Sequence, residues 1–202
     1  MHRLTSDPTA ARSWRRARYG FAHHLGEALV GTAGGQSQLR GPVIYGVWLR
    51  WGLLYIGQTS KAERRLRDLA VGESHHLANT FPPEIWHKVV VLAWPELPQA
   101  RSLAGTIDLR TAGLALEFAL QDQLCPIVNS ERRRPDGGWR EVVRQGSRSR
   151  GALAMHKVTD LVQQVRGLWD ATPSEPSNGA NVPEACRVVF PEQLLLERYP
   201  LT

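Results

Sequence analysis

The sequence predicts an α/β sandwich, and three observations point to this fold class. Two apolar, β-prone runs at 43–49 and 53–57 are separated by a short turn, which is typical of a β-hairpin. A helical stripe follows, then a short apolar run at 89–92, then an almost wholly apolar helix at 111–124. This order of hairpin, helix, strand and helix across residues 42–130 indicates a compact α/β domain.

Each of these elements has its own local signal. Ser60 and Glu63 have the spacing of a capping box at the start of the helix after the hairpin. Apolar side chains at helical spacing then form one stripe on that helix. The run at 89–92 is Val-Val-Val-Leu, as expected for a buried strand. The helix at 111–124 ends before Pro126, because proline cannot continue a helix.

The remaining residues are expected to extend this core on both sides. The four expected parts are an N-terminal tail with a helix from about residue 13 in 1–41, the core in 42–130, a basic segment and a helix in 131–172, and a flexible linker with a C-terminal tail in 173–202. The C-terminal tail contains one further strand candidate, Val188-Val189-Phe190.

Composition points to a polyanionic partner. The chain has 202 residues, of which 42% are hydrophobic and 22% charged, as in ordinary globular proteins. Its net charge of +6 favours nucleic acid or an anionic membrane surface. Two distant cysteines form neither a disulfide framework nor a zinc site. Because we find no signal peptide and no apolar stretch long enough to span a bilayer, we expect a cytoplasmic protein.

Two tyrosines stand ten residues apart in the hairpin, Tyr45 in the first run and Tyr55 in the second. If the hairpin has no bulge and the pairing register is even, both phenols point from the same face of the sheet. Two phenols on one face can line a site, although tyrosine is also favoured in strands for packing alone.

Three polar side chains follow the hairpin. Arg65 lies at the edge of an apolar helical stripe, where it could reach the sheet and hold a phosphate, or face solvent with Arg64 and Arg67. Glu117 stands inside an apolar run, where a carboxylate needs a salt bridge or a cation. A lone carboxylate with waters and a substrate phosphate is a common Mg²⁺ arrangement. Asn129 follows the helix end, where it can be a turn residue or reach a phosphate.

The order and spacing of these residues resemble the GIY-YIG nuclease superfamily. Val43-Ile44-Tyr45 corresponds to the first triplet and Tyr55-Ile56-Gly57 to the second. Arg65 follows Tyr55 by ten residues, and Glu117 precedes Asn129 by twelve. The resemblance covers less than half of the chain. It implies an antiparallel three-stranded sheet flanked by helices, with helical extensions, in a stand-alone enzyme of the restriction-endonuclease type.

The resemblance also implies a role for each residue at a phosphodiester bond in DNA. Tyr45 would act as general base or position the attacking water, and Tyr55 would help to hold that water. Arg65 would stabilise charge on the phosphate in the transition state. Glu117 would bind one Mg²⁺ or Mn²⁺ ion, and Asn129 would be an accessory polar contact. Because a free tyrosine has a pKa near 10, the site must lower the pKa of Tyr45.

The chain departs from the family pattern at three positions. Val43 replaces the first glycine, and Gln58 replaces a frequent lysine. Leu69 stands where many members have His or Tyr, so His75 and His76 are the nearest candidates for a proton-handling role. These departures leave a second hypothesis open, in which the chain is a catalytically silent nucleic-acid-binding protein on the same scaffold.

A basic segment follows Asn129 and is expected to contact the DNA backbone. Its candidate DNA-binding residues are Arg132, Arg133, Arg134, Arg140 and Arg144, with Trp139 among them. The run from Trp14 to Arg18 is a second, weaker basic patch that contains an aromatic side chain. Because one such site cuts one strand, a restriction-type enzyme would act as a homodimer. A membrane partner is not expected, because no basic amphipathic helix has a clean apolar face.

Overall fold

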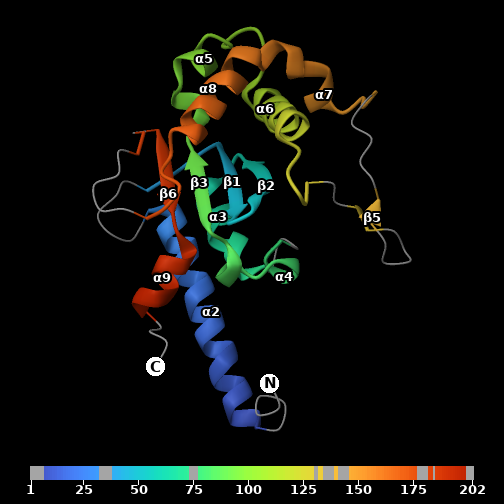
Figure 1. The fold of residues 1–202 in the computed structure, drawn as a ribbon. Helices are drawn as coiled ribbons and strands as arrows, with labels where there is room; N and C mark the ends of the chain where they lie inside the picture. The colour runs from blue at the N-terminus through green and yellow to red at the C-terminus, as the bar shows by residue number, and fades with distance from the viewer. Residues whose placement is uncertain are drawn as a thin grey trace.

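The computed structural model describes residues 7–31, 38–72, 77–129, 132–133, 139–140, 146–176, 182–183 and 185–198 (Figure 1). Its centre is a four-stranded antiparallel sheet with the strand order β2-β1-β3-β6. The strands are β1 (Val43–Leu49), β2 (Gly52–Thr59), β3 (Lys88–Leu92) and β6 (Cys186–Val189). The hairpin and the third strand were predicted, but the sheet has four strands rather than three.

The helices cover both faces of this sheet. They are α2 (Pro8–Val30), α3 (Ala62–Val71), α4 (Leu77–Thr80), α5 (Pro98–Arg101), α6 (Leu109–Leu124), α7 (Arg150–Ala154), α8 (Thr159–Asp170) and α9 (Pro191–Arg198), with 3-10 turns η1 (Pro83–Ile85), η2 (Trp94–Glu96) and η3 (Met155–Val158). Within the described ranges, none of them is both long and apolar enough to cross a bilayer.

Alternation along the strands divides the core into two layers. Tyr45, Val47 and Val91 pack in the cluster that contains the buried side chains of α2 and α3. Ile44 and Ile56 point the other way and pack with α6 and α8. This two-sided burial follows from the period of two in a β-strand, and it explains why β1 and β3 read as continuous apolar runs.

The hairpin register brings the two tyrosines to one face, as predicted, although the hairpin does contain a bulge. Tyr45 lies opposite Gly57, and Tyr55 lies opposite Val47. The register shifts between Val47 and Trp48, which is nearer the turn than either tyrosine pair. The bulge therefore leaves the phenols on a common face.

The sequence extensions contribute to the same core. Phe21, Leu25 and Leu29 of α2 are buried beside the sheet. The tail strand β6 pairs with β3 and so covers what would have been an exposed sheet edge. A separate pair, β4 (Arg132–Arg133) and β5 (Trp139–Arg140), forms a two-stranded sheet, with β5 drawn well away from the body in Figure 1.

Helix starts differ from the sequence predictions. The N-cap of α3 is Lys61, which makes no capping hydrogen bond through its side chain, so the capping box from Ser60 to Glu63 was wrong. The Ala62 amide instead donates to the Gly41 carbonyl at 3.0 Å. The long helix α2 begins at Pro8 rather than near residue 13, because the Asp7 side chain caps its first turn.

Two helical glycines give a matched test of how α2 is packed. A Cβ at Gly26 would lie 2.7 Å from the carbonyl oxygen of Arg67, which is backbone and cannot swing away. We expect Gly26→Ala to lower the free energy of unfolding by roughly 1–3 kcal/mol. A Cβ at Gly167 of α8 would meet nothing within 4 Å, so Gly167→Ala should raise this free energy by roughly 0.5–1 kcal/mol.

Urea unfolding followed by circular dichroism measures both changes. A neutral or stabilising effect of Gly26→Ala would show that α2 is not held as closely to α3 as the structure describes.

Candidate active site

A hydrogen bond between α3 and the hairpin forms the centre of the candidate site. The Arg65 Nε donates to the Tyr45 phenol oxygen at 3.0 Å. The rings of Tyr45 and Tyr55 lie with their centroids 6.1 Å apart. Tyr45 is fully buried and Tyr55 is 7% exposed. Three residues from distant parts of the predicted motif thus come together.

Gly57 makes room for this arrangement. It lies opposite Tyr45 in the hairpin register. A Cβ at Gly57 would approach the Tyr45 phenol oxygen to 2.5 Å and the Tyr55 ring to 2.7 Å. Packing therefore explains why the second triplet ends in glycine, because any larger residue at position 57 would push the two phenols away.

The electrostatics of Tyr45 differ from the sequence prediction. Burial raises the pKa of Tyr45 above its ordinary value, and this effect outweighs the nearby charge and hydrogen bond of Arg65, which lower it. The Glu117 carboxylate raises the pKa further, whereas a hydrogen bond with Tyr55 lowers it. A tyrosine poised as a base was expected to have a lowered pKa, so the Tyr45 phenol is held here in its protonated form.

Arg65 keeps its charge in this half-buried position. Burial lowers the pKa of Arg65, but its interactions with Tyr45 and Tyr55 raise that pKa by more. The result is a guanidinium fixed at one nitrogen and charged over the whole accessible pH range.

Glu117 reaches the site from the opposite layer of the sandwich. Its helix, α6, packs on the face of the sheet that does not bear the tyrosines. Because β2 is an edge strand, the side chain can pass around it, and Oε1 accepts a hydrogen bond from the Gln58 amide at 3.2 Å. Gln58 is next to Gly57, so the site straddles the end of β2.

Glu117 is also the residue that fits a divalent cation. Within the described ranges there is no cluster of three or more His, Cys, Asp or Glu side chains able to hold a metal ion. Glu117 is a half-buried oxygen donor whose Oε1 contacts a backbone amide. A single carboxylate completed by waters and a substrate phosphate matches the preferences of Mg²⁺.

Asn129 has a structural role that sequence reasoning assigned differently. Its Oδ1 accepts from the Ile56 amide at 2.5 Å, and its Nδ2 donates to the Ile56 carbonyl at 2.6 Å. The preceding amides of Ile127 and Val128 donate to the carbonyls of β2 at 3.1 and 2.9 Å. Asn129 is therefore committed to closing the edge of β2, rather than poised as a contact for phosphate.

Gln121 was missed by the sequence argument. Its Nε2 donates to the Ile56 carbonyl at 3.1 Å, so it supports the same strand from α6. A signal was present, because Gln121 follows Glu117 by four residues and such residues share a helix face.

A basic cavity adjoins the Tyr45–Arg65 pair. This cavity has a volume of about 250 Å³ and is lined by Thr59, Ser60, Lys61, Arg64, Arg65 and Asp68. Its three cationic side chains outnumber the acidic lining residue, Asp68. The charge of this lining is complementary to that of a phosphate.

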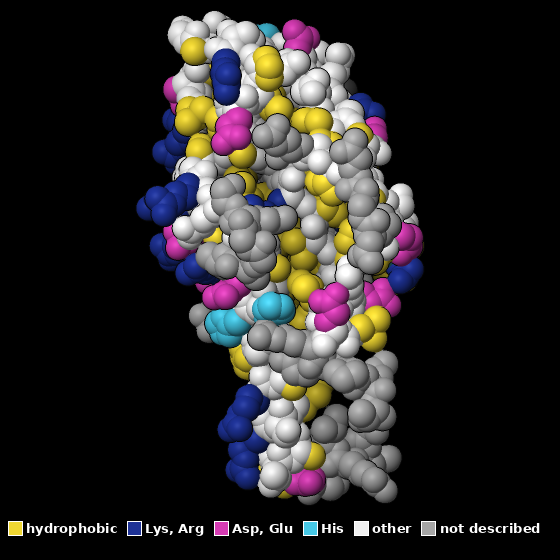
Figure 2. Space-filling model, turned by 90° about the vertical axis from the view of Figure 1, so that its left-hand side faces the viewer, with side chains coloured by type: hydrophobic (Ala, Val, Ile, Leu, Met, Phe, Trp, Pro, Cys, Tyr) yellow, Lys and Arg dark blue, Asp and Glu magenta, His cyan; other side chains and the backbone are white. Residues whose placement is uncertain are grey.

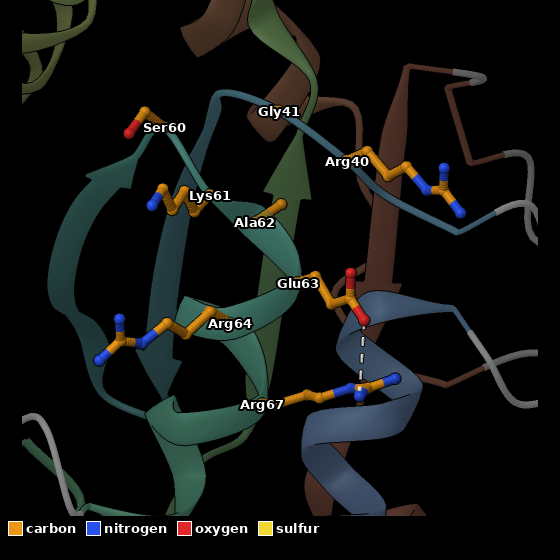
Figure 3. Close-up of a pocket in the computed structure, with 8 residues that line it drawn as sticks. All are labelled: Arg40, Gly41, Ser60, Lys61, Ala62, Glu63, Arg64 and Arg67. Carbon is orange, nitrogen blue, oxygen red and sulfur yellow. Dashed lines mark ion pairs between the residues drawn. The ribbon is translucent and has the colours of Figure 1, made fainter.

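A larger neighbouring cavity, of about 560 Å³, shares Ser60, Lys61 and Arg64 with this lining but does not include Arg65 (Figure 3). In Figure 3, Lys61 and Arg64 point to one side and Arg40 points to the other. Glu63 lies between them and pairs with Arg67 at 3.5 Å. The smaller cavity is the one that includes Arg65, which bonds to Tyr45.

Several predicted residues are not placed with the site. His75, His76, Arg134 and Arg144 lie outside the described residues. Only the backbones of Arg132, Arg133 and Arg140 are described, in the β4–β5 pair. Leu69, at the position where a protonatable side chain was expected, is fully buried in the core.

The chain matches no known protein-family profile, no curated protein and no solved structure. What the site does must therefore be argued from the contacts of Tyr45, Arg65 and Glu117.

The raised pKa of Tyr45 predicts a loss of stability at alkaline pH. The unfolded chain ionises this phenol near pH 10, whereas the folded chain retains the proton to higher pH. Rising pH therefore favours the unfolded chain, and the free energy of unfolding falls above about pH 10. In Tyr45→Phe this part of the fall should be absent, although the lost bond to Arg65 lowers stability at neutral pH.

Tyr19→Phe is the matched control, because Tyr19 is 50% exposed and its replacement should leave the alkaline fall as in the wild type. Urea unfolding at several pH values measures the difference. An equal alkaline fall in the two variants would contradict the raised pKa.

Proposed function

We propose that the protein is a divalent-metal-dependent DNA endonuclease that hydrolyses phosphodiester bonds. The observation that supports this most is the Arg65–Tyr45 hydrogen bond of 3.0 Å beside a basic cavity, with Glu117 at the end of the same hairpin. The site thus combines a fixed cation for a phosphate with a carboxylate for a metal.

Arg65 is the residue proposed to grip the scissile phosphate. A guanidinium has five N–H donors, and its Nε serves Tyr45. The bond to Tyr45 limits the rotation of the side chain, so little freedom is lost when a phosphate binds. Its positive charge then stabilises the extra negative charge that develops in the transition state.

Tyr45 is proposed to position groups rather than to remove a proton. It is fully buried, and its raised pKa keeps the phenol neutral. A neutral phenol can orient Arg65 and a neighbouring water, which is the second of the two roles that the resemblance implies. Because the Glu117 charge contributes to the raised pKa, neutralising that carboxylate would lower the pKa of Tyr45.

The reaction is a hydrolysis. The water oxygen forms a bond to phosphorus and releases a proton to solvent, one ester P–O bond breaks, and the leaving oxygen takes up a proton from solvent. A divalent cation at Glu117 would polarise the phosphate and stabilise the leaving oxygen. The chain itself contributes the fixed guanidinium, the phenols and the basic walls of the cavity.

A restriction-type, homodimeric enzyme is the form of this activity that we propose. One such site would cut one strand, so a double-strand cut would require two protomers. The net charge of +6 suits the DNA backbone.

A second candidate function is DNA binding without cleavage. Two observations favour it, the complete burial of Tyr45 and the buried Leu69 at the position where a protonatable residue was expected. Both candidates share the basic cavity, so they differ in cutting and not in binding.

A plasmid-nicking assay distinguishes the two. Purified protein is incubated with supercoiled DNA in Mg²⁺, Mn²⁺ or EDTA, beside the variants Glu117→Ala and Arg65→Ala. We expect metal-dependent nicking, reduced at least about 100-fold in both variants because each removes transition-state charge stabilisation. Asp122→Ala, an exposed carboxylate on the same helix, should nick like the wild type.

The pattern of cutting and binding decides between the candidates. Discrete bands that depend on the metal support the restriction-type enzyme. If no metal produces nicks while a gel-shift assay shows DNA binding, the silent DNA-binding function stands instead. Nicking that persists in Glu117→Ala would contradict the assigned metal ligand.

A further inference from the structure

The first half of α2 is a projecting arm. Side chains from Phe21 to Val30 include the buried residues of the helix, whereas those from Pro8 to Gly20 are exposed or half-buried. Figure 1 shows this part of α2 extending below the sheet and the other described helices. We call residues 8–20 the arm.

The arm is basic, and its charge is concentrated on one face. Between Asp7 and Glu27 the helix has no acidic residue. The exposed residues with the spacing i, i+3, i+4, i+7 and i+11 are Arg12, Arg15, Arg16, Tyr19 and His23. Residues at these spacings lie on one side of an α-helix, so they form a continuous stripe.

The stripe has no acidic partner in the part of the chain that the structure describes. Arg12 makes a 3.4 Å hydrogen bond to Thr9, which belongs to the arm itself. No described carboxylate forms an ion pair with Arg12, Arg15 or Arg16. Three like charges within about one helical turn repel one another, so a polyanion that neutralises them would be bound favourably.

The other side of the arm is fastened to the body. Arg18 pairs with Glu84 at 3.2 Å and donates to the Ala78 carbonyl at 3.3 Å. Its guanidinium also lies 6.0 Å from the ring of Trp14. Together with the close contact of Gly26 and α3, these interactions hold the arm at a fixed angle to the helix that bears Arg65.

We propose that the arm binds duplex DNA, with Arg12, Arg15 and Arg16 on the phosphates of the duplex that occupies the site. That this duplex is the substrate rests on the proposed function. The positive charge of the arm is independent of that function. An α-helix fits the major groove of B-DNA, and arginine suits phosphate oxygens.

The rise of the helix gives the length of the arm beyond its contact with α3. A helix rises 1.5 Å per residue, so Arg16 lies roughly 15 Å and Arg12 roughly 21 Å along α2 from its contact at Gly26. B-DNA advances about 3.4 Å per base pair, so this length corresponds to about four to six base pairs. In Figure 2, dark blue Lys and Arg side chains lie along the left edge of both the projecting part and the body.

Composition argues against a membrane as the ligand. The face of the arm away from the stripe carries small or polar residues, with Trp14 as its large apolar side chain. Helices that lie in a membrane interface bury a broad face of large apolar residues, which the arm lacks.

The test measures binding without cutting. Affinity for a 30-base-pair duplex is measured by fluorescence anisotropy in EDTA at several salt concentrations, for the wild type and for the triple variant Arg12→Gln, Arg15→Gln, Arg16→Gln. Glutamine keeps the helix propensity of arginine, and circular dichroism checks that α2 persists. We expect the affinity of the arm variant to be at least about tenfold lower at low salt. The slope of the logarithm of the association constant against the logarithm of the salt concentration should become less steep by about 2 to 3.

The matched control is the triple variant Arg101→Gln, Arg110→Gln, Lys157→Gln. These residues are exposed on α5, α6 and η3, and the variant loses the same net charge. It should change affinity less than about threefold, with the slope nearly unchanged. Equal losses in the two triple variants would overturn the arm as a DNA-binding element.

Two further outcomes would also overturn the proposal. In the first, the wild type binds phosphatidylserine vesicles but not DNA, and the arm variant no longer binds the vesicles. In the second, the wild type sediments as a dimer and the arm variant as a monomer, while both bind DNA with the same affinity. If the arm variant loses DNA binding while the wild type cuts nothing, the arm stands and the nuclease function fails. If the wild type cuts DNA and the arm variant binds DNA with wild-type affinity, the nuclease function stands and the proposal for the arm fails.

Discussion

The absence of a side chain at Gly57 determines most of the site, because the two phenols occupy the space that a Cβ would take. Because Gly57 has no side chain, the Tyr45 phenol can lie over it and accept the 3.0 Å hydrogen bond from Arg65. This bond joins α3 to the hairpin. A second close contact, between Gly26 of α2 and the backbone of α3, fixes the direction of the arm. Two glycines thus link strand pairing, helix packing and the position of a cation.

Burial then decides what each polar group can do. The phenol of Tyr45 lies inside the core, so its pKa is raised and it stays neutral beside a charged guanidinium. Glu117 approaches around the edge of β2 from the other layer, where it remains half-buried and bonded to the Gln58 amide. The fixed positive charge and the carboxylate are therefore held apart by one strand. A phosphate and a cation are the pair of ligands that would complement them.

Local patterns in the sequence were sufficient for the central elements and for the proximity of three candidate site residues. The hairpin, the strand β3 and the helix α6 follow from runs whose periodicity is visible within a short window. Tyr45, Tyr55 and Arg65 come together because their spacing follows from hairpin register and one helical turn.

Features that depend on tertiary contacts could not be predicted in the same way. The pairing of β6 with β3 joins residues about a hundred positions apart, and no local pattern encodes it. The helix start at Ala62 is held by Gly41 rather than by a capping box. The role of Asn129 depends on Ile56, which the chain brings close only after folding. The raised pKa of Tyr45 likewise follows from complete burial.

A crystal structure of the protein with Mn²⁺ and a DNA duplex that carries one hydrolysis-resistant phosphorothioate tests most directly whether Glu117 holds a metal and Arg65 a phosphate. The account predicts an anomalous Mn²⁺ peak at the Glu117 carboxylate and a backbone phosphate within hydrogen-bond distance of the Arg65 guanidinium. Mn²⁺ bound elsewhere, or DNA whose phosphates do not contact Arg65, would contradict it.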